Sequence, residues 1–148
     1  MEKVDVIDRR ILNLLMQDSR QSSRQMASQL KTSAATVLSR MQKLEKSGVI
    51  KKYSALANYE KLGYDVEVVI NIKISKGKLF QVEKKIAVHP NVFAVYDVTG
   101  DYDVVVIARF QNRRALDAFL KNIQTYDFVE KTHTTLILNV IKDERMGV

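Results

Sequence analysis

The sequence predicts an α+β fold: a three-helix N-terminal domain of the helix-turn-helix type, a hinge strand, and a C-terminal ferredoxin-like βαββαβ domain. Two patterns predict it. Up to Ser47, apolar residues recur every three or four positions, which is typical of amphipathic helices. From Val66 the period changes to two, which is typical of strands. The 148 residues, 46% of them hydrophobic, are enough for two small domains with packed cores.

Three helices are expected before residue 50. The first follows Asp5, a suitable N-terminal cap. Its apolar stripe consists of Val4, Ile7, Ile11, Leu14 and Leu15. The next two helices form a pair with a tight turn between them, and Ser23 and Ser33 are the expected caps. Their inner faces consist of Met26, Ala27 and Leu30, then Val37, Met41 and Leu44. Gly48 then ends the third helix in a left-handed conformation.

The remaining elements alternate between strands and helices. A short strand is expected at 49–56 and a connector at 58–63. Strands at 66–74, 92–98, 102–110 and 132–141, with helices at 79–87 and 116–123, follow the order of a ferredoxin-like sheet. This gives a helix-turn-helix domain at 1–50, a hinge and linker at 51–63 and a C-terminal domain at 64–148. Because both helices cover one face of the sheet, we expect a second copy of the chain to cover the other, as a homodimer.

The positive charge of the chain is concentrated near its N-terminus. The net charge is +7, and residues 1–62 hold 12 basic and 6 acidic residues, against 12 and 11 in residues 63–148. This asymmetry favours double-stranded DNA as a partner, with solubility or a solvated helix face as the plain alternative. Arg40 and Lys43 are expected to bind phosphates, or Arg40 a guanine edge. The predicted DNA-binding residues are Arg24, Gln25, Ser33, Ala34, Ala35, Thr36, Ser39, Arg40 and Lys43.

Several classes of protein are not favoured. The chain has no cysteine, so disulfides and thiolate metal sites are excluded. No nucleophile–base pair and no phosphate-binding glycine loop is found, so we expect neither an enzyme nor a cofactor. Two histidines make a poor metal site, although Asp97, Asp101 and Asp103 could bind Mg²⁺ or Ca²⁺. No apolar run could span a membrane, and no export signal is evident, so a cytoplasmic, nucleoid-associated protein is expected.

Four segments carry a resemblance to a known family. They are the opening VDVIDRRIL at 4–12, the helix pair, RMQKLEKSGVI at 40–50 and TGDYD at 99–103. Through them the chain resembles, nearly end to end, the Lrp/AsnC family of feast/famine transcription regulators. The resemblance implies a C-terminal ligand-sensing (RAM) domain and dimers that assemble further, often to octamers. It also implies a small effector, usually an amino acid.

The resemblance also implies an effector site. In that family the turn equivalent to residues 100–103 lines pockets between subunits. Gly100 would expose backbone amides to a carboxylate, and Asp101 or Asp103 would accept from an ammonium group. The plain alternatives are a hairpin turn and strand-forming threonines. The implied effector-binding residues are Gly100, Asp101, Tyr102, Asp103, Thr132, Thr134 and Thr135.

Two positions depart from the family pattern. Lys31 stands in the turn of the helix pair, where the family often has glycine, and Thr32 follows where a larger apolar residue is usual. A left-handed lysine costs roughly 1 kcal/mol relative to glycine, so a turn of different construction is expected here. Both departures blur the start of the third helix.

The predicted function is a sequence-specific transcription regulator whose assembly or DNA binding responds to a small effector, an amino acid by resemblance. The first alternative is an architectural, chromatin-like protein that coats DNA without an effector response. The second is an enzyme or enzyme regulator built on the ferredoxin-like half, which would leave the basic helix pair without a purpose.

Overall fold

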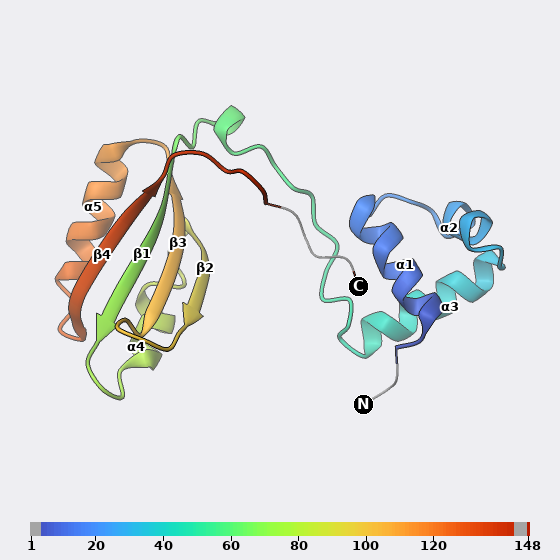
Figure 1. Ribbon diagram of the computed structural model, residues 1–148, viewed down its shortest axis with the longest axis horizontal. Helices are drawn as coiled ribbons and strands as arrows, with labels where there is room; N and C mark the ends of the chain where they lie inside the picture. Colours follow the sequence, from blue (N-terminus) through green and yellow to red (C-terminus); the bar gives the residue numbers. More distant parts are fainter. Residues whose placement is uncertain (1–3, 144–147) are drawn as a thin grey trace. The chain divides into compact units, whose positions relative to one another are not determined.

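The computed structural model describes residues 4–143 and 148, which form two compact units. Residues 4–56, with 142, 143 and 148, belong to the N-terminal unit, and residues 57–141 form the C-terminal unit. Figure 1 shows the three helices of the first and the sheet of the second. Within the residues described, no helix is both long and apolar enough to cross a membrane.

Each helix of the N-terminal unit begins directly after a side chain that caps it. The helices are α1 (Val6–Gln17), α2 (Ser23–Leu30) and α3 (Ala34–Lys46). Asp5 caps α1 and Ser33 caps α3, and both predictions are confirmed. A cap satisfies backbone N–H groups that have no partner within the helix, so it fixes where the helix starts.

The predicted cap of α2 is wrong by one residue. Ser22, not Ser23, precedes the helix. The Ser22 hydroxyl accepts from the Gln25 N–H group, and the Gln25 side chain accepts from the Ser22 N–H group at 2.8 Å. This reciprocal pair is a capping box, and it sets the start of the helix more strongly than a single serine would.

A small apolar core joins the three helices. Its buried side chains are Ile11, Leu15, Met26, Ala27 and Val37, with Leu14, Leu30, Ala34, Met41 and Ile50 partly buried around them. Leu44 is also buried. The inner faces predicted for the helix pair are therefore confirmed.

The turn between α2 and α3 is built on a left-handed residue after all. Lys31 has φ 52° and ψ 48°, and it is the single non-glycine residue with positive φ among those described. The next N–H group, that of Thr32, donates to the carbonyl of Ala27 at 3.0 Å. These are the features of a glycine-type helix end. The expectation of a different construction is wrong, because the lysine adopts the conformation that glycine normally supplies.

The segment after α3 has less regular structure than predicted. Gly48 has φ +73° and ends the helix as expected. Residues 51–58 form no strand, because a strand requires a hydrogen-bonded neighbour and the described residues supply none. A short 3-10 helix, η1 (Glu60–Leu62), follows in the C-terminal unit.

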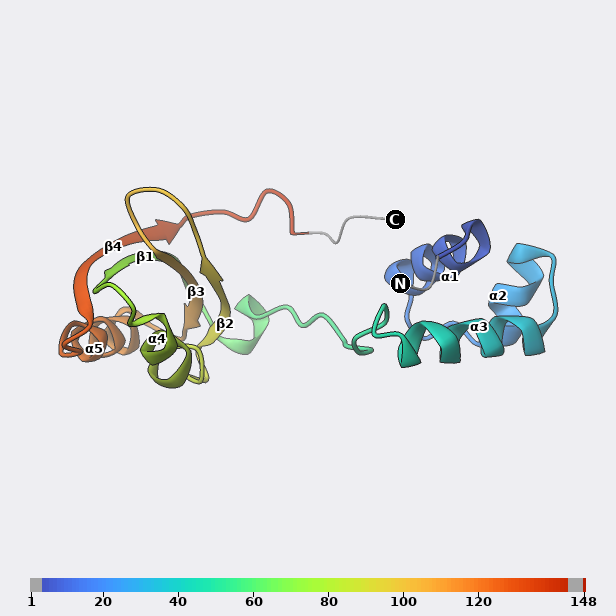
Figure 2. The same cartoon turned by 90° about the horizontal axis from the view of Figure 1, so that it is seen from below.

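The C-terminal unit has the predicted ferredoxin-like topology. Its elements are β1 (Val66–Ile74), α4 (Leu79–Lys85), β2 (Val92–Asp97), β3 (Val104–Phe110), α5 (Arg113–Gln124) and β4 (Val129–Ile137). The strands lie in the order β2-β3-β1-β4, and every neighbouring pair is antiparallel. Figure 2 shows α4 and α5 on the same side of the sheet. β4 was predicted at 132–141, but it begins at Val129 and ends at Ile137, because β1 offers pairing partners only over this length.

The core of the C-terminal unit lies between the sheet and the two helices. Buried and half-buried residues alternate along the whole of β1 and β3, as the period of two predicts. The largest buried side chains include Phe110, Phe128, Ile70, Ile72, Ile86 and Ile123. They form one cluster that extends from β1 and β3 to α4 and α5.

Within residues 57–141, no helix covers the other face of the sheet, and that face is partly apolar. Val69, Val105 and Ile107 alternate with the buried residues and are half-buried, and Tyr96 is 54% exposed. Arg109 also lies on this face, bonded to Glu67 at 2.6 Å and stacked between the rings of Phe93 and Tyr59. We call this surface the open face.

Candidate functional site

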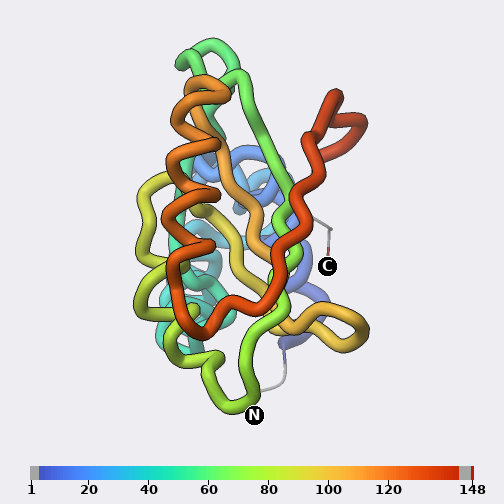
Figure 3. Tube along the Cα trace, turned by 90° about the vertical axis from the view of Figure 1, so that its left-hand side faces the viewer, coloured from blue at the N-terminus to red at the C-terminus, as the bar shows by residue number. Residues whose placement is uncertain are grey.

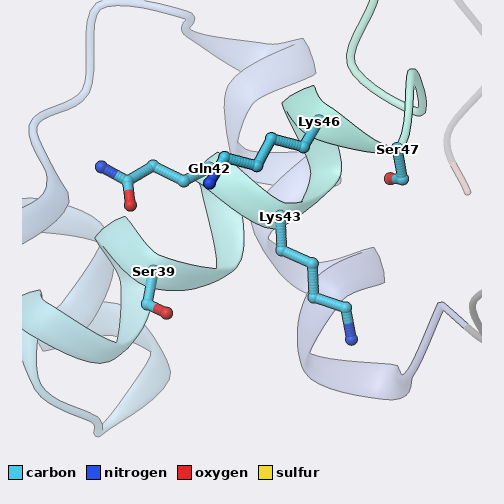
Figure 4. Close-up of a pocket in the computed structure, with 5 residues that line it drawn as sticks. All are labelled: Ser39, Gln42, Lys43, Lys46 and Ser47. Carbon is cyan, nitrogen blue, oxygen red and sulfur yellow. The ribbon is translucent and has the colours of Figure 1, made fainter.

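The exposed side of α3 carries a row of polar side chains. Ser39, Gln42, Lys43, Lys46 and Ser47 line a shallow groove along the helix, as Figure 4 shows. The sequence predicted Ser39 and Lys43 but missed the other three. The signal was present, because Gln42 and Lys46 follow Ser39 by three and seven positions, the spacing of one helical face.

A second hollow adjoins this groove toward the start of α3. It is lined by Ala35, Thr36, Ser39, Arg40 and Lys43, together with Asp5 from the chain before α1. Five of the predicted DNA-binding residues therefore lie together. They are small, hydroxylated or basic, so they suit close approach to a groove and its phosphates.

Other predicted DNA-binding side chains are already engaged within the unit. The Ser33 hydroxyl accepts from the Thr36 N–H group at 3.0 Å and lies 2.8 Å from the Thr36 hydroxyl. The amide of Gln25 belongs to the capping box of α2. Arg24 is exposed on α2.

Arg40 differs most from its prediction. Its Nη1 atom donates to Asp5 Oδ2 at 2.6 Å and to Asp8 Oδ1 at 2.7 Å, which leaves the side chain 27% exposed. The Asp8 side chain is 3% exposed. The guanidinium therefore faces the start of α1 rather than pointing outward, and it joins the first and third helices. We call this contact the Arg40 bridge.

The Arg40 bridge changes the electrostatics at the start of α1. The N–H group of Asp8, and after it the guanidinium of Arg40, lower the pKa of Asp5 from 3.8 to about 2. The two carboxylates raise the pKa of Arg40 in turn, with the hydrogen bond that Arg40 donates to Asp5 as the largest cause. Hydrogen bonds to a charged form favour that form, so Asp5 and Arg40 both stay ionised at neutral pH.

The loop between β2 and β3 contains the predicted effector turn. Gly100 has φ +119°, a conformation that L side chains rarely adopt. Figures 2 and 3 show this loop projecting on the side of the sheet opposite to α5. Asp101 is exposed, whereas Tyr102 is half-buried.

Asp103 anchors the loop to the end of β1. Its carboxylate accepts from the Ile74 N–H group at 2.9 Å and lies 3.3 Å from the Lys73 ammonium group. The bond from Ile74, opposed by partial burial and assisted by Lys73, lowers the pKa of Asp103. Asp103 thus holds the loop to β1, whereas Asp101 is exposed.

The loop also approaches β4. The ring of Tyr102 lies 6.4 Å from that of His133 and 5.8 Å from the Lys131 ammonium group. The sequence did not assign His133 or Lys131 to this site, because only the register of β4 against β1 brings them to the open face.

The same register separates the predicted threonines. Thr132 and Thr134 lie opposite Ile72 and Ile70, whose side chains are buried beneath the helices. Thr135 lies opposite Val69 on the open face. Directly opposed residues in an antiparallel pair share a face, so the three hydroxyls do not gather on one surface.

The described residues contain no group of three or more His, Asp or Glu side chains that could hold a metal ion. The alternative of a site formed by Asp97, Asp101 and Asp103 is therefore not supported there. The rings of His89 and Phe119 are tilted against each other with 4.7 Å between their centroids, and burial lowers the pKa of His89.

Comparison with known proteins divides the chain in the same way. The family model described as a winged helix-turn-helix DNA-binding domain matches residues 4–51. The model described as the Lrp/AsnC ligand binding domain matches residues 67–146.

Curated relatives match along nearly the whole length. The chain is 42% identical over 142 residues to an uncharacterized HTH-type transcriptional regulator of Pyrococcus horikoshii, covering 96% of each chain. It is 37% identical over 140 residues to the HTH-type transcriptional regulator FL11 of Pyrococcus furiosus, covering 95% of this chain and 93% of that one.

Solved structures have the same fold. The structure of AsnC from E. coli superposes with a TM-score of 0.92 at 28% identity and covers 99% of both chains. A regulator from Neisseria meningitidis, solved as a complex with L-Met, gives a TM-score of 0.90 at 23% identity over 96% of this chain and 94% of that one. With both halves matched in the expected order, the chain belongs to the Lrp/AsnC family of DNA-binding transcriptional regulators.

Proposed function

We propose that this chain recognises specific DNA sequences with the exposed side of α3 and responds to an amino-acid effector at the loop between β2 and β3. The observation that carries the first part is the row of Ser39, Gln42 and Lys46 along α3, flanked by Lys43. Lysines in such a row bind phosphates, whereas serine and glutamine read base edges.

Gln42 is the side chain best suited to base reading. Its amide can donate to and accept from one adenine at the same time. Arg40 is less suited, because its Nη1 atom is bonded to Asp5 and Asp8. We therefore propose Ser39, Gln42, Lys43 and Lys46, with Ala35 and Thr36, as the principal contacts.

Selection from a random pool of DNA duplexes tests this assignment. The wild-type chain should select a roughly palindromic site, since a two-fold dimer presents two equivalent helices. Gln42→Ala should lose its preference at one base pair per half-site, a change on the order of 1–3 kcal/mol in discrimination. Its salt dependence should not change, because glutamine carries no charge.

Gln124→Ala, at the exposed end of α5, is the matched control and should select the wild-type site. If the wild-type chain enriched no sequence and bound all duplexes with a steep salt dependence, the architectural alternative would be correct.

The effector proposal is supported by the loop geometry and by one neighbour. Gly100 leaves the backbone of the projecting loop uncovered, and Asp101 offers an exposed carboxylate for an α-ammonium group. Lys131 and His133 of β4 lie near the same loop, where they approach the ring of Tyr102. The Neisseria structure was solved with an amino acid, L-Met.

Assembly is expected to accompany effector binding. On the open face Tyr96 is exposed and Val105 and Ile107 are half-buried, and a second copy of the chain would cover all three. We propose a homodimer through this face, which can associate further, and a cytoplasmic, nucleoid-associated location that follows from the DNA partner.

Sedimentation of the full chain with each common amino acid in turn tests the effector proposal. One amino acid should shift the sedimentation coefficient. Binding of DNA should then change the affinity of the chain for that amino acid, by the same factor by which the amino acid changes the affinity of the chain for DNA. Asp101→Ala should abolish the shift, whereas Asp117→Ala on the exposed side of α5 should not. An unchanged titration of Asp101→Ala would remove this residue from the site.

A further inference from the structure

Lys31 occupies a position that disfavours it. Its left-handed backbone is the only one of its kind at a non-glycine residue within 4–143 and 148. The conformation is imposed by the turn, since the Thr32 N–H group must reach the carbonyl of Ala27 for α2 to end there. Glycine would adopt it without steric strain, so lysine here is less stable than the simplest alternative.

The side chain of Lys31 does not offset this strain by burial in the core of the N-terminal unit. It is exposed, and it does not belong to the core formed by α1, α2 and α3. Strain that the fold does not require is concentrated at functional positions in proteins. The function of this side chain is therefore directed outward.

The surroundings indicate what it meets. Arg24 and Ser28 are four residues apart on one side of α2, and Lys31 directly follows the helix; all three are exposed. The backbone positions of Arg24 and Lys31 are separated by about 10 Å along the helix axis at 1.5 Å per residue. Lys31 lies in the turn that leads into α3, the helix that carries the groove of Ser39 and Lys43.

We propose that Lys31, together with Arg24, binds backbone phosphates of the DNA, and that this contact is the reason for a lysine in a glycine position. The inference rests on DNA binding through α3 and adds a second, sequence-independent contact surface on α2 and its turn. Its ligand is the phosphate group of duplex DNA, which a flexible ammonium group meets as a point charge.

Lys31→Gly separates this role from a structural one, because the two predict opposite changes. Removing the strain should raise the thermal unfolding midpoint of the N-terminal unit by about 5 °C. Removing one phosphate contact should weaken DNA binding about eightfold per DNA-binding domain at 0.1 M salt, and should reduce the salt slope by about 0.9. A more stable protein that binds more weakly is the expected result.

Two variants of the full chain complete the experiment. Lys31→Arg should retain wild-type affinity and salt slope, since the charge is kept. Lys121→Gln, which removes a lysine paired with Asp117 on α5, controls for the loss of net charge and should bind as the wild type.

The outcomes are distinguishable. Wild-type affinity and salt slope in Lys31→Gly, or a lower unfolding midpoint, would overturn this inference while leaving the proposed reading of DNA by α3 intact. A wild-type chain that bound no duplex at all would overturn the proposed function, and the phosphate contact with it.

Discussion

Different interactions stabilise each of the two units of this chain internally. In the C-terminal unit one continuous cluster of Val, Ile and Phe side chains fills the space between sheet and helices. In the N-terminal unit five buried apolar residues form the central cluster, and the helices are fixed further by capping side chains and by the Arg40 bridge. The sheet therefore depends mainly on apolar burial, whereas the DNA-binding unit depends more on charge and hydrogen bonds.

The largest expected effect comes from opening the core of the C-terminal unit. Phe110 is buried in β3 and packs on Phe119 of α5 at 5.3 Å between ring centroids. Phe110→Ala should destabilise this unit by about 3–5 kcal/mol through lost burial and a cavity. Hydrogen exchange of backbone amides measures the loss in β1, β3 and α5. If α1–α3 lost protection to the same extent, the two units would not be independent.

A smaller effect is expected from breaking the Arg40 bridge. Arg40→Ala leaves the buried Asp8 carboxylate without its cation, and should cost about 2 kcal/mol, less than a fully buried pair because Arg40 is partly exposed. Urea unfolding followed through the N-terminal unit measures this, and the C-terminal unit should be unaffected. Unchanged stability combined with weaker DNA binding would instead make Arg40 a direct DNA contact, as the sequence first indicated.

The smallest effect is expected from acid. The pKa of Asp5 is about 2 in the folded chain, below the ordinary value of 3.8 that it has in the unfolded chain, so the unfolded chain binds the proton more readily. The stability due to Asp5 is complete above about pH 5 and is lost as the pH falls through 3.8 toward 2. The N-terminal unit of Asp5→Asn should therefore show a shallower decline over this interval than that of the wild type, measured by circular dichroism. Identical acid transitions would contradict the role of Asp5.

Local patterns in the sequence were sufficient to predict most of the fold and part of the candidate site. The period of two in β1 and β3, and the serine and aspartate before α3 and α1, act over a few residues and were predictable. Ser39 and Lys43 were predictable for the same reason. The Arg40 bridge joins residues more than thirty positions apart, which no helical period reveals.

The remaining differences also have long-range causes. The face that each threonine of β4 occupies depends on the register against β1, and the ends of β4 depend on the length of that neighbour. The segment at 49–56 has the composition of a strand, but pairing needs a partner that a single chain does not provide there. At Lys31 the turn requires a left-handed backbone, and this requirement outweighs the preference of lysine for other backbone conformations.

The two edge strands of the sheet differ in how readily a strand from another molecule could pair with them. β2, at one edge, has six residues, and its register shifts between Val92 and Ala94, an irregularity that discourages the addition of a foreign strand. β4, at the other edge, has nine residues and pairs regularly from Lys131 to Ile137. Its acidic and ammonium side chains stand only near its start, at Glu130 and Lys131. Aggregation on heating or overproduction should therefore begin at the second half of β4, and a charge introduced there would be the first remedy for an insoluble preparation.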